Sequence, residues 1–300
     1  RYINCFVDYA EHARNSKYFQ LSYMAPNNEL PVYDTVVKHG FVTHDDGKYH
    51  KFTYIISDAY GNKSTVEFKV KALTKNPQVK FGAQDVTPFV QILLWDKANK
   101  IEEHEFTFET PEKSVYRNTV FKWSSVKASG NKLSPSITIG DKYTPLHKAC
   151  TLSIAMSQLT EAPDKLVVVR EKDKGGLSSV GGTWNGKGMN VEIKEFGTYF
   201  VMRDTAAPTI KAINFDKEVK VQKDFSAMKS IQLKIGDNLS GIQFYSGTID
   251  GKWVLFEYDP KKDMLKYTFD DSITKGSHEL KVTVIDKCGN ERKYVKEFVR

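Results

Sequence analysis

Short segments with alternating side chains recur along the whole chain, and this pattern restricts the possible folds more than any other feature of the sequence. The clearest segments, five to eight residues long, lie at residues 49–56, 65–70, 165–169, 189–193, 198–202, 231–235, 253–258 and 279–284. Alternation of this kind places one face of a strand on a core and the other in solvent, as in antiparallel sheets. Helical periodicity is nearly absent, apart from residues 8–18, where Ala, Glu and Arg allow a helical turn.

Many short strands separated by turns predict an all-β protein made of tandem immunoglobulin-like β-sandwich domains. The 300-residue length suits two or three such domains, because a single core seldom grows past that size. Aromatic residues make up 12% of the chain, an excess that fits pleated, half-buried surfaces. No apolar run approaches the roughly 20 residues that span a bilayer, so we expect no transmembrane segment.

Two parts of the sequence, residues 47–70 and 276–299, repeat one hairpin pattern. Each reads as a strand, an Asp-x-x-Gly-Asn turn and a return strand, and the turns begin at Asp58 and Asp286. Gly and Asn tolerate positive φ, and we expect the Asp side chain to cap its own turn. Since this hairpin typically ends a bacterial immunoglobulin-like domain, it marks domain ends near residues 72 and 300.

A Pro-containing stretch from Arg203 to Ile210 signals the remaining boundary. We therefore predict an N-terminally truncated β-sandwich at 1–72, a middle β-sandwich at 73–204 and a C-terminal immunoglobulin-like β-sandwich at 205–300. The chain opens on Arg1, inside an apparent strand and without an initiator Met. We expect the natural N-terminus, with any signal peptide or lipid anchor, to lie upstream.

Charge and cysteine content argue against two classes of function. The net charge of +7 suits an anionic partner, but the lysines are scattered and no recognition helix, zinc finger or RNP motif is present, so we expect no nucleic-acid partner. Cys5, Cys150 and Cys288 fall one in each predicted domain, which leaves no intradomain disulfide and no zinc-ribbon spacing. We expect three reduced and mostly buried thiols.

Several motifs carry a family resemblance. They are the stretch from Asp204 to Ile210, the Asp-Asn-Leu-Ser-Gly-Ile segment at 237–242 and the run from Gly247 to Asp259, together with residues 1–33 and 196–200. These motifs resemble the C-terminal region of Bacteroidetes zinc metallopeptidases of the lysostaphin-like family, over essentially the whole chain. The resemblance implies an exported, periplasmic or envelope-associated protein in which a zinc peptidoglycan endopeptidase domain, with H-x-x-x-D and H-x-H motifs, precedes the sandwiches.

The zinc ligands of that family have no counterpart in this sequence. No two histidines stand as H-x-H and none is followed four residues later by Asp; the seven are His12, His39, His44, His50, His104, His147 and His278. Catalytic zinc needs three protein ligands and an open fourth position. We therefore expect no catalytic residue, no metal site and no cofactor in this chain, with zinc confined to an upstream domain.

Two groups of metal-ligand residue types have competing interpretations. The densest is His39, His44, Asp45, Asp46 and His50, but in a hairpin the Asp45-Asp46-Gly47 segment is an ordinary turn, and the histidines need not converge. A second group, formed by Asp237, Asn238 and Asp250, offers oxygen ligands for calcium, yet no EF-hand spacing is present. Capped turns are the favoured interpretation of both groups.

Three single residues are further candidates for catalysis or ligand contact. His104 lies between two glutamates and is expected to face solvent rather than to act as an acid or base. Trp184 and Trp253 are candidates for stacking on a sugar ring. Trp253 follows an apolar strand pattern that favours a core position, whereas Trp184 lies among Gly and Asn residues and is the better candidate for ligand contact.

The sequence therefore predicts a non-catalytic accessory or scaffold region of a cell-envelope peptidoglycan metalloendopeptidase, which positions or regulates the peptidase domain upstream of it. The expected partners are that domain in cis, and peptidoglycan or another envelope protein. The alternative is a glycan-binding or adhesive module, which an exposed aromatic platform would favour. A hydrolase in its own right would need a preformed zinc site. Fold alone does not choose among these functions.

Overall fold

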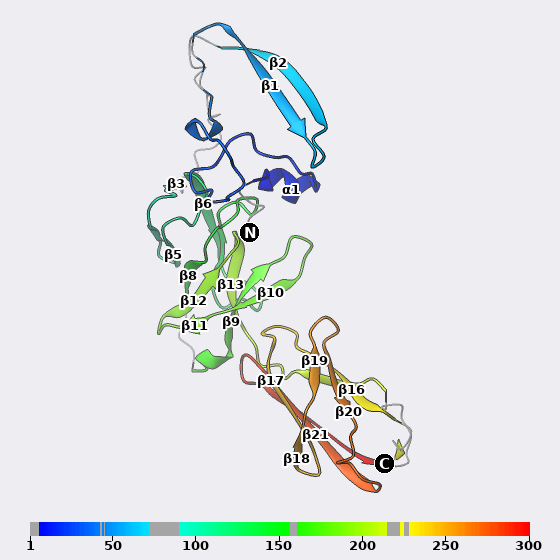
Figure 1. Ribbon diagram of the computed structural model, residues 1–300. Helices are drawn as coiled ribbons and strands as arrows, with labels where there is room; N and C mark the ends of the chain where they lie inside the picture. Colours follow the sequence, from blue (N-terminus) through cyan, green and yellow to red (C-terminus); the bar gives the residue numbers. More distant parts are fainter. Residues whose placement is uncertain are drawn as a thin grey trace. The chain divides into compact units, whose positions relative to one another are not determined.

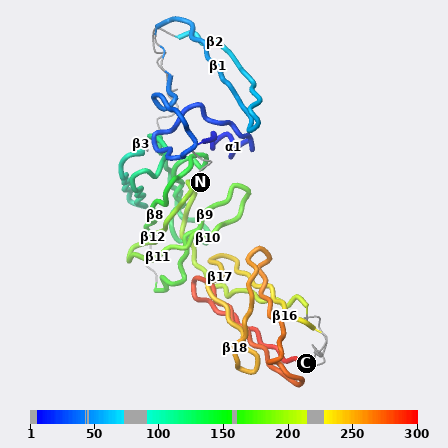
Figure 2. The backbone as a smooth tube through the Cα atoms, viewed as in Figure 1, coloured from blue at the N-terminus to red at the C-terminus, as the bar shows by residue number. Residues whose placement is uncertain are grey.

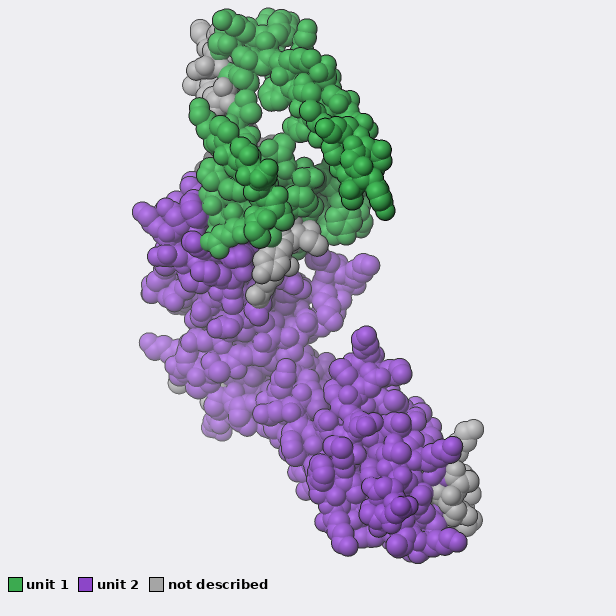
Figure 3. Space-filling model, in the orientation of Figure 1, with its two compact units in different colours: residues 1–90 green, residues 91–300 purple. Residues whose placement is uncertain are grey.

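The computed structural model describes residues 6–42, 44, 46–72, 90–156, 161–214, 223–224 and 228–300. The chain divides into two compact units, residues 1–90 and 91–300 (Figure 3). Strands dominate both units, so the predicted all-β class is confirmed, and the second unit contains two β-sandwiches (Figure 1). Among the described residues no helix is long and apolar enough to cross a membrane.

The first unit contains one long hairpin and one short helix among its described residues. Strands β1 (Tyr49–Ser57) and β2 (Lys63–Lys71) pair antiparallel along their full length. The helix α1 (Tyr9–Asn15) lies in the stretch where a helical turn was expected, and Asp8 caps it by accepting a hydrogen bond from the Glu11 backbone N–H. A 3₁₀ turn, η2, covers Lys38–Gly40. The predicted truncated sandwich is represented here by this single two-stranded sheet.

The middle sandwich packs a six-stranded sheet on a five-stranded sheet (Figure 1). The first sheet has the order β10 (Leu177–Gly181), β9 (Leu166–Glu171), β13 (Gly197–Arg203), β7 (Ser136–Ile139), β6 (Thr119–Val126) and β3 (Val90–Leu93). The second has the order β11 (Thr183–Trp184), β12 (Gly188–Ile193), β8 (Cys150–Ala155), β5 (Phe106–Thr110) and β4 (Asn99–Glu102). A 3₁₀ turn, η3 (Pro163–Lys165), leads into β9.

Aromatic rings fill the centre of the middle sandwich. Phe108 and Phe121 come from opposite sheets, are both 0% exposed and stack with ring centroids 5.0 Å apart. Phe196 packs on both rings. The alternating burial of β5 and β8 shows why this core forms, because every second residue of each strand points inward.

The C-terminal sandwich packs a four-stranded sheet on a five-stranded one. The first has the order β14 (Thr209–Ala212), β16 (Ser230–Gly236), β20 (Met264–Thr268) and β19 (Glu257–Asp259). The second has the order β15 (Lys223–Asp224), β22 (Glu291–Val299), β21 (Ser277–Asp286), β17 (Ile242–Ile249) and β18 (Lys252–Val254). Figure 2 shows the backbone passing from the middle sandwich, in green, into this one, in yellow to red.

The expected strand at 253–258 is divided between the two sheets of the C-terminal sandwich. Its first part is β18 and its last part is β19, so the chain changes sheet at Leu255 and Phe256. Phe256 is 3% exposed and belongs to the core. The change of sheet corrects the prediction of a single strand, which alternation alone could not distinguish from two.

Both Asp-x-x-Gly-Asn turns form as predicted, one between β1 and β2 and one between β21 and β22. Asp58 Oδ1 accepts hydrogen bonds from the backbone N–H groups of Tyr60 and Asn62, each at 2.9 Å. Asp286 makes the equivalent bonds to residues 288 and 290, and in each turn the Asn side chain donates to the second Asp oxygen. The glycines of the two turns have φ of 84° and 70°, a region that favours glycine.

Candidate functional site

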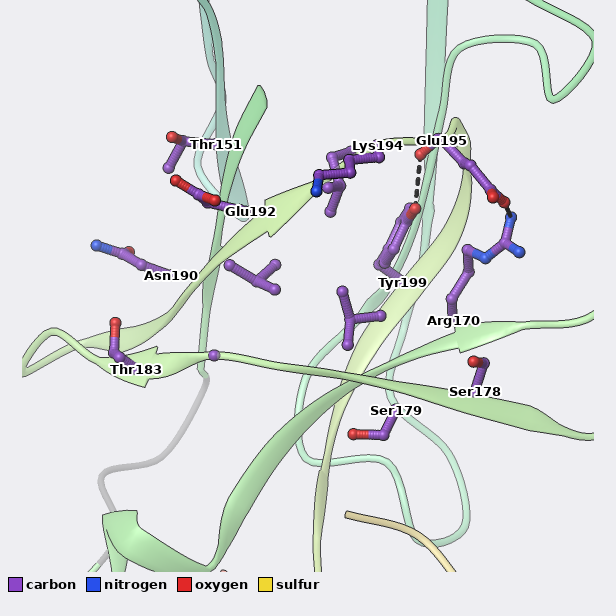
Figure 4. Close-up of a pocket in the computed structure, with 14 residues that line it drawn as sticks. Thr151, Arg170, Ser178, Ser179, Thr183, Asn190, Glu192, Lys194, Glu195 and Tyr199 are labelled. Atoms are coloured by element: carbon purple, nitrogen blue, oxygen red, sulfur yellow. Dashed lines mark hydrogen bonds and ion pairs between the residues drawn. The ribbon is translucent and has the colours of Figure 1, made fainter. Parts of the chain in front are cut away.

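A polar groove of about 750 Å³ opens at one edge of the middle sandwich, where β10 faces β11 and β12 (Figure 4). Three of its polar residues contact one another: Arg170 on β9, Glu195 in the bend before β13, and Tyr199 on β13. The Arg170 guanidinium lies 2.5 Å from a Glu195 carboxylate oxygen, and the Tyr199 hydroxyl donates a 2.6 Å hydrogen bond to the Glu195 backbone carbonyl. Burial raises the pKa of Tyr199, so its hydroxyl keeps its proton across the physiological range.

The groove can bind a polar molecule, but its lining offers no activated nucleophile. Ser178, Ser179 and Thr183 contribute hydroxyls, and no His or Cys lines the groove. A hydroxyl nucleophile needs an adjacent base, and the two carboxylates of the lining, Glu192 and Glu195, make no hydrogen bond with these hydroxyls. This groove was not predictable from the sequence, because Arg170 of β9 and Glu195, in the bend between β12 and β13, come together only through the pairing of β9 with β13.

The exposure of the two candidate tryptophans is the reverse of the prediction. Trp253 is 66% exposed on β18 and lines a shallow hollow of about 330 Å³, so the core interpretation was wrong. Trp184, on β11, is half-buried and packs against the middle core. Because its ring is less accessible than that of Trp253, it is the poorer candidate for ligand contact. Leu255, 61% exposed, lies beside Trp253 on the same hollow. The inward side chains of this segment are Val254 and Phe256.

Most histidines are distributed as single residues, and the described ones of the dense group do not assemble into a ligand set. The His44 and His50 rings stack with centroids 3.5 Å apart, while His50 Nε2 contacts Asp46 Oδ1 at 2.8 Å. Asp45 lies outside the described residues. His104 is exposed on the bend between β4 and β5, as expected.

Asp250, expected beside Asp237 if calcium bound to the loop, instead pairs with His278. Asp250 Oδ2 lies 2.7 Å from His278 Nδ1, and His278 Nε2 lies 2.8 Å from the Thr274 carbonyl. Both ring nitrogens face an acceptor, and only the protonated imidazole can donate to both. The hydrogen bond to the Asp250 carboxylate therefore raises the pKa of His278. The same contact lowers the pKa of Asp250.

Two of the three thiols are described, and both are free and buried, as predicted. Burial raises the pKa of Cys150 to about 11, so almost none of it is thiolate near neutral pH. Burial also raises the pKa of Cys288. Cys5 lies outside the described residues.

Several hydrogen bonds connect the middle and C-terminal sandwiches, and this region of contact is called the junction below. Lys165 donates hydrogen bonds from Nζ to the Cys288 carbonyl at 2.7 Å and to Asn290 Oδ1 at 2.8 Å. The Asn290 side chain also donates to the Asp204 carbonyl at 3.0 Å. Each bond joins residues more than 80 positions apart, so the junction is a tertiary contact rather than a turn.

An apolar contact lies beside these polar bonds. Val167 and Val169 on β9 and Phe200 on β13 are at most 2% exposed, although they lie on the opposite face of the sheet from the middle core. They pack against Cys288 and Leu239 of the C-terminal sandwich. The outer face of the six-stranded sheet is therefore buried at the junction.

Three carboxylates meet at the same place. Oxygen atoms of Asp204, Asp237 and Asp286 all lie within 4.8 Å of one another. Asp204 follows β13, Asp237 lies in the loop between β16 and β17, and Asp286 ends β21. In the sequence these residues belong to separate motifs, for which no metal site was predicted, and only the fold brings them together. Asp204 and Asp237 begin two motifs of the family resemblance, and Asp286 begins an Asp-x-x-Gly-Asn turn.

The comparisons with known proteins cover part of the chain. Residues 90–204, the middle sandwich, match a family model described as a Zu5-like domain. No curated protein matches the chain. Among the twelve solved chains that do, one from Clostridium thermocellum is described as CbhA fibronectin(III)-like modules. It is 12% identical with a TM-score of 0.25, over 70% of this chain and 93% of that one. With so loose a superposition, the β-sandwich assignment rests on the strand pairing of the chain itself.

Proposed function

We propose that this chain is a non-catalytic accessory and scaffold region of an exported cell-envelope protein, and that it positions or regulates a peptidoglycan metalloendopeptidase domain upstream of it. The junction is the observation that carries the proposal. A region that positions another domain must transmit its own orientation, and flexibly linked sandwiches would not do so. Here polar bonds and buried apolar side chains join two sandwiches into one compact unit.

The chemistry of the described surface is consistent with this proposal. None of the described residues that line the groove of the middle sandwich is an activated nucleophile, and two of its charged side chains, Arg170 and Glu195, form an ion pair. The peptidase partner and the periplasmic or envelope location are inferred from the motifs that resemble lysostaphin-like peptidases, beginning at Asp204, Asp237 and Gly247. The match to a Zu5-like domain fits a module of a larger protein in general terms.

The test compares the full gene product with two variants: a deletion of residues 209–300, and Lys165→Met, which removes the two junction bonds of that side chain. Muropeptide release from purified sacculi and binding to sacculi are measured. We expect both variants to change the rate or the pattern of release. Lys142→Met, which removes an exposed ion pair with Asp173, is the matched control and should leave both unchanged. Unchanged release and binding in both variants would show that the positioning role is wrong.

A glycan-binding module is the second candidate, and the exposed ring of Trp253 favours it. The ring and Leu255 border a hollow whose lining also includes Thr268, Asp270 and Ser272. An aromatic face beside polar groups is an arrangement suited to stacking on a sugar ring. In the sacculus-binding assay above, Trp253→Ala would then lower the bound fraction. An exposed aromatic in the first unit, Tyr60, is 94% exposed and provides the control substitution Tyr60→Ala.

A further inference from the structure

Among the described residues, the three carboxylates at the junction have no direct ion pair with a basic side chain, although the Lys165 ammonium lies in the same hydrogen-bond cluster. Asp204 is 2% exposed and Asp286 is 0% exposed. Lys165 crosses the junction but donates to the Cys288 carbonyl and the Asn290 side chain instead. Buried carboxylates are normally paired with a cation or bound to a metal, because close like charges repel one another strongly in a low-dielectric interior.

Two buried oxygens at this cluster have no hydrogen-bond partner among the described residues. One is Asp237 Oδ1; the other oxygen of that carboxylate accepts bonds from the N–H groups of Leu239 and Gly241. The other is the hydroxyl of Ser240, a residue that is 1% exposed; its backbone N–H donates to Asp204 Oδ2 at 2.9 Å, and beside its hydroxyl lies the weakly hydrogen-bonding Cys288 thiol. An unsatisfied buried oxygen costs roughly 1–3 kcal/mol, so two at one place need a physical explanation.

We propose that Asp204, Asp237 and Asp286 bind a Ca²⁺ ion at the junction. The donor set consists of carboxylate oxygens, which hard cations prefer. Oxygens bound to one Ca²⁺ at about 2.3–2.6 Å can lie up to about 5 Å apart, and the observed limit of 4.8 Å fits that range. Asp237 is only half-buried, which leaves an approach for the ion and for the waters that complete its coordination.

The hydrogen bonds already present orient this ligand set. In Asp286, Oδ1 accepts two backbone N–H bonds and Oδ2 accepts one bond from the Asn290 side chain, so the carboxylate is fixed before any ion arrives. Each carboxylate keeps at least one oxygen with acceptor capacity to spare: Asp286 Oδ2 and both Asp204 oxygens accept one bond each, and Asp237 Oδ1 accepts none. The ion would join the end of the middle sandwich at Asp204 to two loops of the C-terminal sandwich. This inference does not depend on the proposed peptidase partner.

The experiment uses the 300-residue chain after treatment with EDTA, titrated with CaCl₂ and, separately, with MgCl₂. Calorimetry should show one Ca²⁺ per chain with a Kd on the order of 10⁻⁴ M, the range of extracellular modules. Thermal unfolding in 10 mM CaCl₂ should occur roughly 5–10 °C higher than in EDTA. MgCl₂ at the same concentration should give a smaller increase, because Mg²⁺ demands a tighter octahedral geometry.

Asp237→Asn is the informative variant. The Asn oxygen can still accept the two N–H bonds of the loop, so the turn is retained while one charge and one ligand are lost. In EDTA we expect this variant to be at least as stable as the wild type, since the repulsion is relieved. In CaCl₂ it should gain no stability. Asp204→Asn should behave in the same way and serves as the second variant if Asp237→Asn does not fold.

Asp250→Asn is the matched control, because Asp250 was the alternative loop ligand for calcium and instead contacts His278. It should bind Ca²⁺ with unchanged affinity. The proposal is overturned if the wild type binds no Ca²⁺ at 10 mM, if Asp237→Asn and Asp204→Asn retain binding, or if Asp250→Asn abolishes it. Binding of Mg²⁺ without Ca²⁺ would likewise exclude calcium as the ion.

Discussion

Asp250 occupies the first position of a two-residue turn between β17 and β18, and its backbone has φ of 51°. Asp-Gly is a favoured pair for such a turn, because both residues must tolerate positive φ. The turn aims the Asp250 carboxylate at His278, whose side chain is 9% exposed and packs beside Phe298. Asp250 thereby contributes both to the geometry of the hairpin turn and to the raised pKa of the His278 imidazole.

Asp250→Asn is predicted to lower the pKa of His278 while leaving the turn intact, since Asn also tolerates positive φ. The hydrogen bond that the imidazole makes to the Asp250 carboxylate is the main cause of the raised His278 pKa, and burial of the imidazole and the charge of Arg300 oppose it. NMR titration of the imidazole in wild type and variant measures the change. An unchanged His278 pKa in Asp250→Asn would contradict the assignment.

The same pair makes stability depend on pH in a defined window. A raised His pKa contributes stability that is fully present below the unfolded value of about 6.5 and is lost as pH rises through the folded value. The lowered pKa of Asp250 contributes above its unfolded value of about 3.9 and is lost as pH falls through its folded value. The pair therefore stabilises the fold most between about pH 4 and 6.5, and Asp250→Asn should remove that increment.

At the scale of elements, close approach of β8 and β12 depends on one glycine. Gly188 is buried opposite Ala155, and a Cβ at Gly188 would overlap the backbone carbonyl of Ile154. Backbone cannot rotate away as a side chain can, so the strands would have to separate. Gly188 thus permits the close pairing of β12 with β8, and the other neighbour of β12 is β11, which carries Trp184.

Gly188→Ala is predicted to destabilise the middle sandwich by about 3 kcal/mol. Gly236→Ala in β16 is the matched control, because its Cβ would meet only the Thr209 side chain, at an ordinary 3.5 Å. That control should change stability by less than about 0.5 kcal/mol. Urea unfolding of the three proteins gives the comparison, and equal stabilities for the two variants would refute the steric argument.

Local chemistry made most elements predictable, whereas side-chain placement depended on the fold. Strand segments and both Asp-x-x-Gly-Asn turns follow from alternation and from the capping capacity of Asp. Trp253 shows the limit: choosing Val254 and Phe256 as inward residues places Trp253 outward, and the opposite choice is equally apolar. The groove and the carboxylate cluster were not predictable, because strand pairing and domain packing bring Arg170 to Glu195 and Asp204 to Asp286.

At the scale of the whole molecule, β9 explains why the two sandwiches of the second unit adhere. Its first four residues, Leu166 to Val169, are all buried, which is unusual for an antiparallel strand with one solvated face. Leu166 and Val168 contact the middle core, while Val167 and Val169 contact the junction. The continuous apolar run at 166–169 was the signal in the sequence that both faces of this sheet are covered.

Lys165→Met is predicted to uncouple the unfolding of the two sandwiches. It leaves the Cys288 carbonyl and the Asn290 oxygen without their charged donor, a loss of about 2 kcal/mol at the junction. Differential scanning calorimetry should show one coupled transition in the wild type and two separated transitions in the variant. Lys142→Met, with an exposed ion pair, should retain the wild-type trace. A single unchanged transition in Lys165→Met would mean that its bonds do not couple the sandwiches.

The short connection between the sandwiches also differs from an ordinary interdomain linker in its exposure to proteases. Several of its backbone groups are hydrogen-bonded. The Asp204 N–H donates to the Lys165 carbonyl, the Asp204 carbonyl accepts from Asn290, and the Pro208 carbonyl accepts from Arg292. A protease must draw a cleavable segment out of such bonds before it can enter the active-site cleft. The residues that connect the two sandwiches are therefore held by hydrogen bonds that oppose cleavage, unlike those of a flexible interdomain linker.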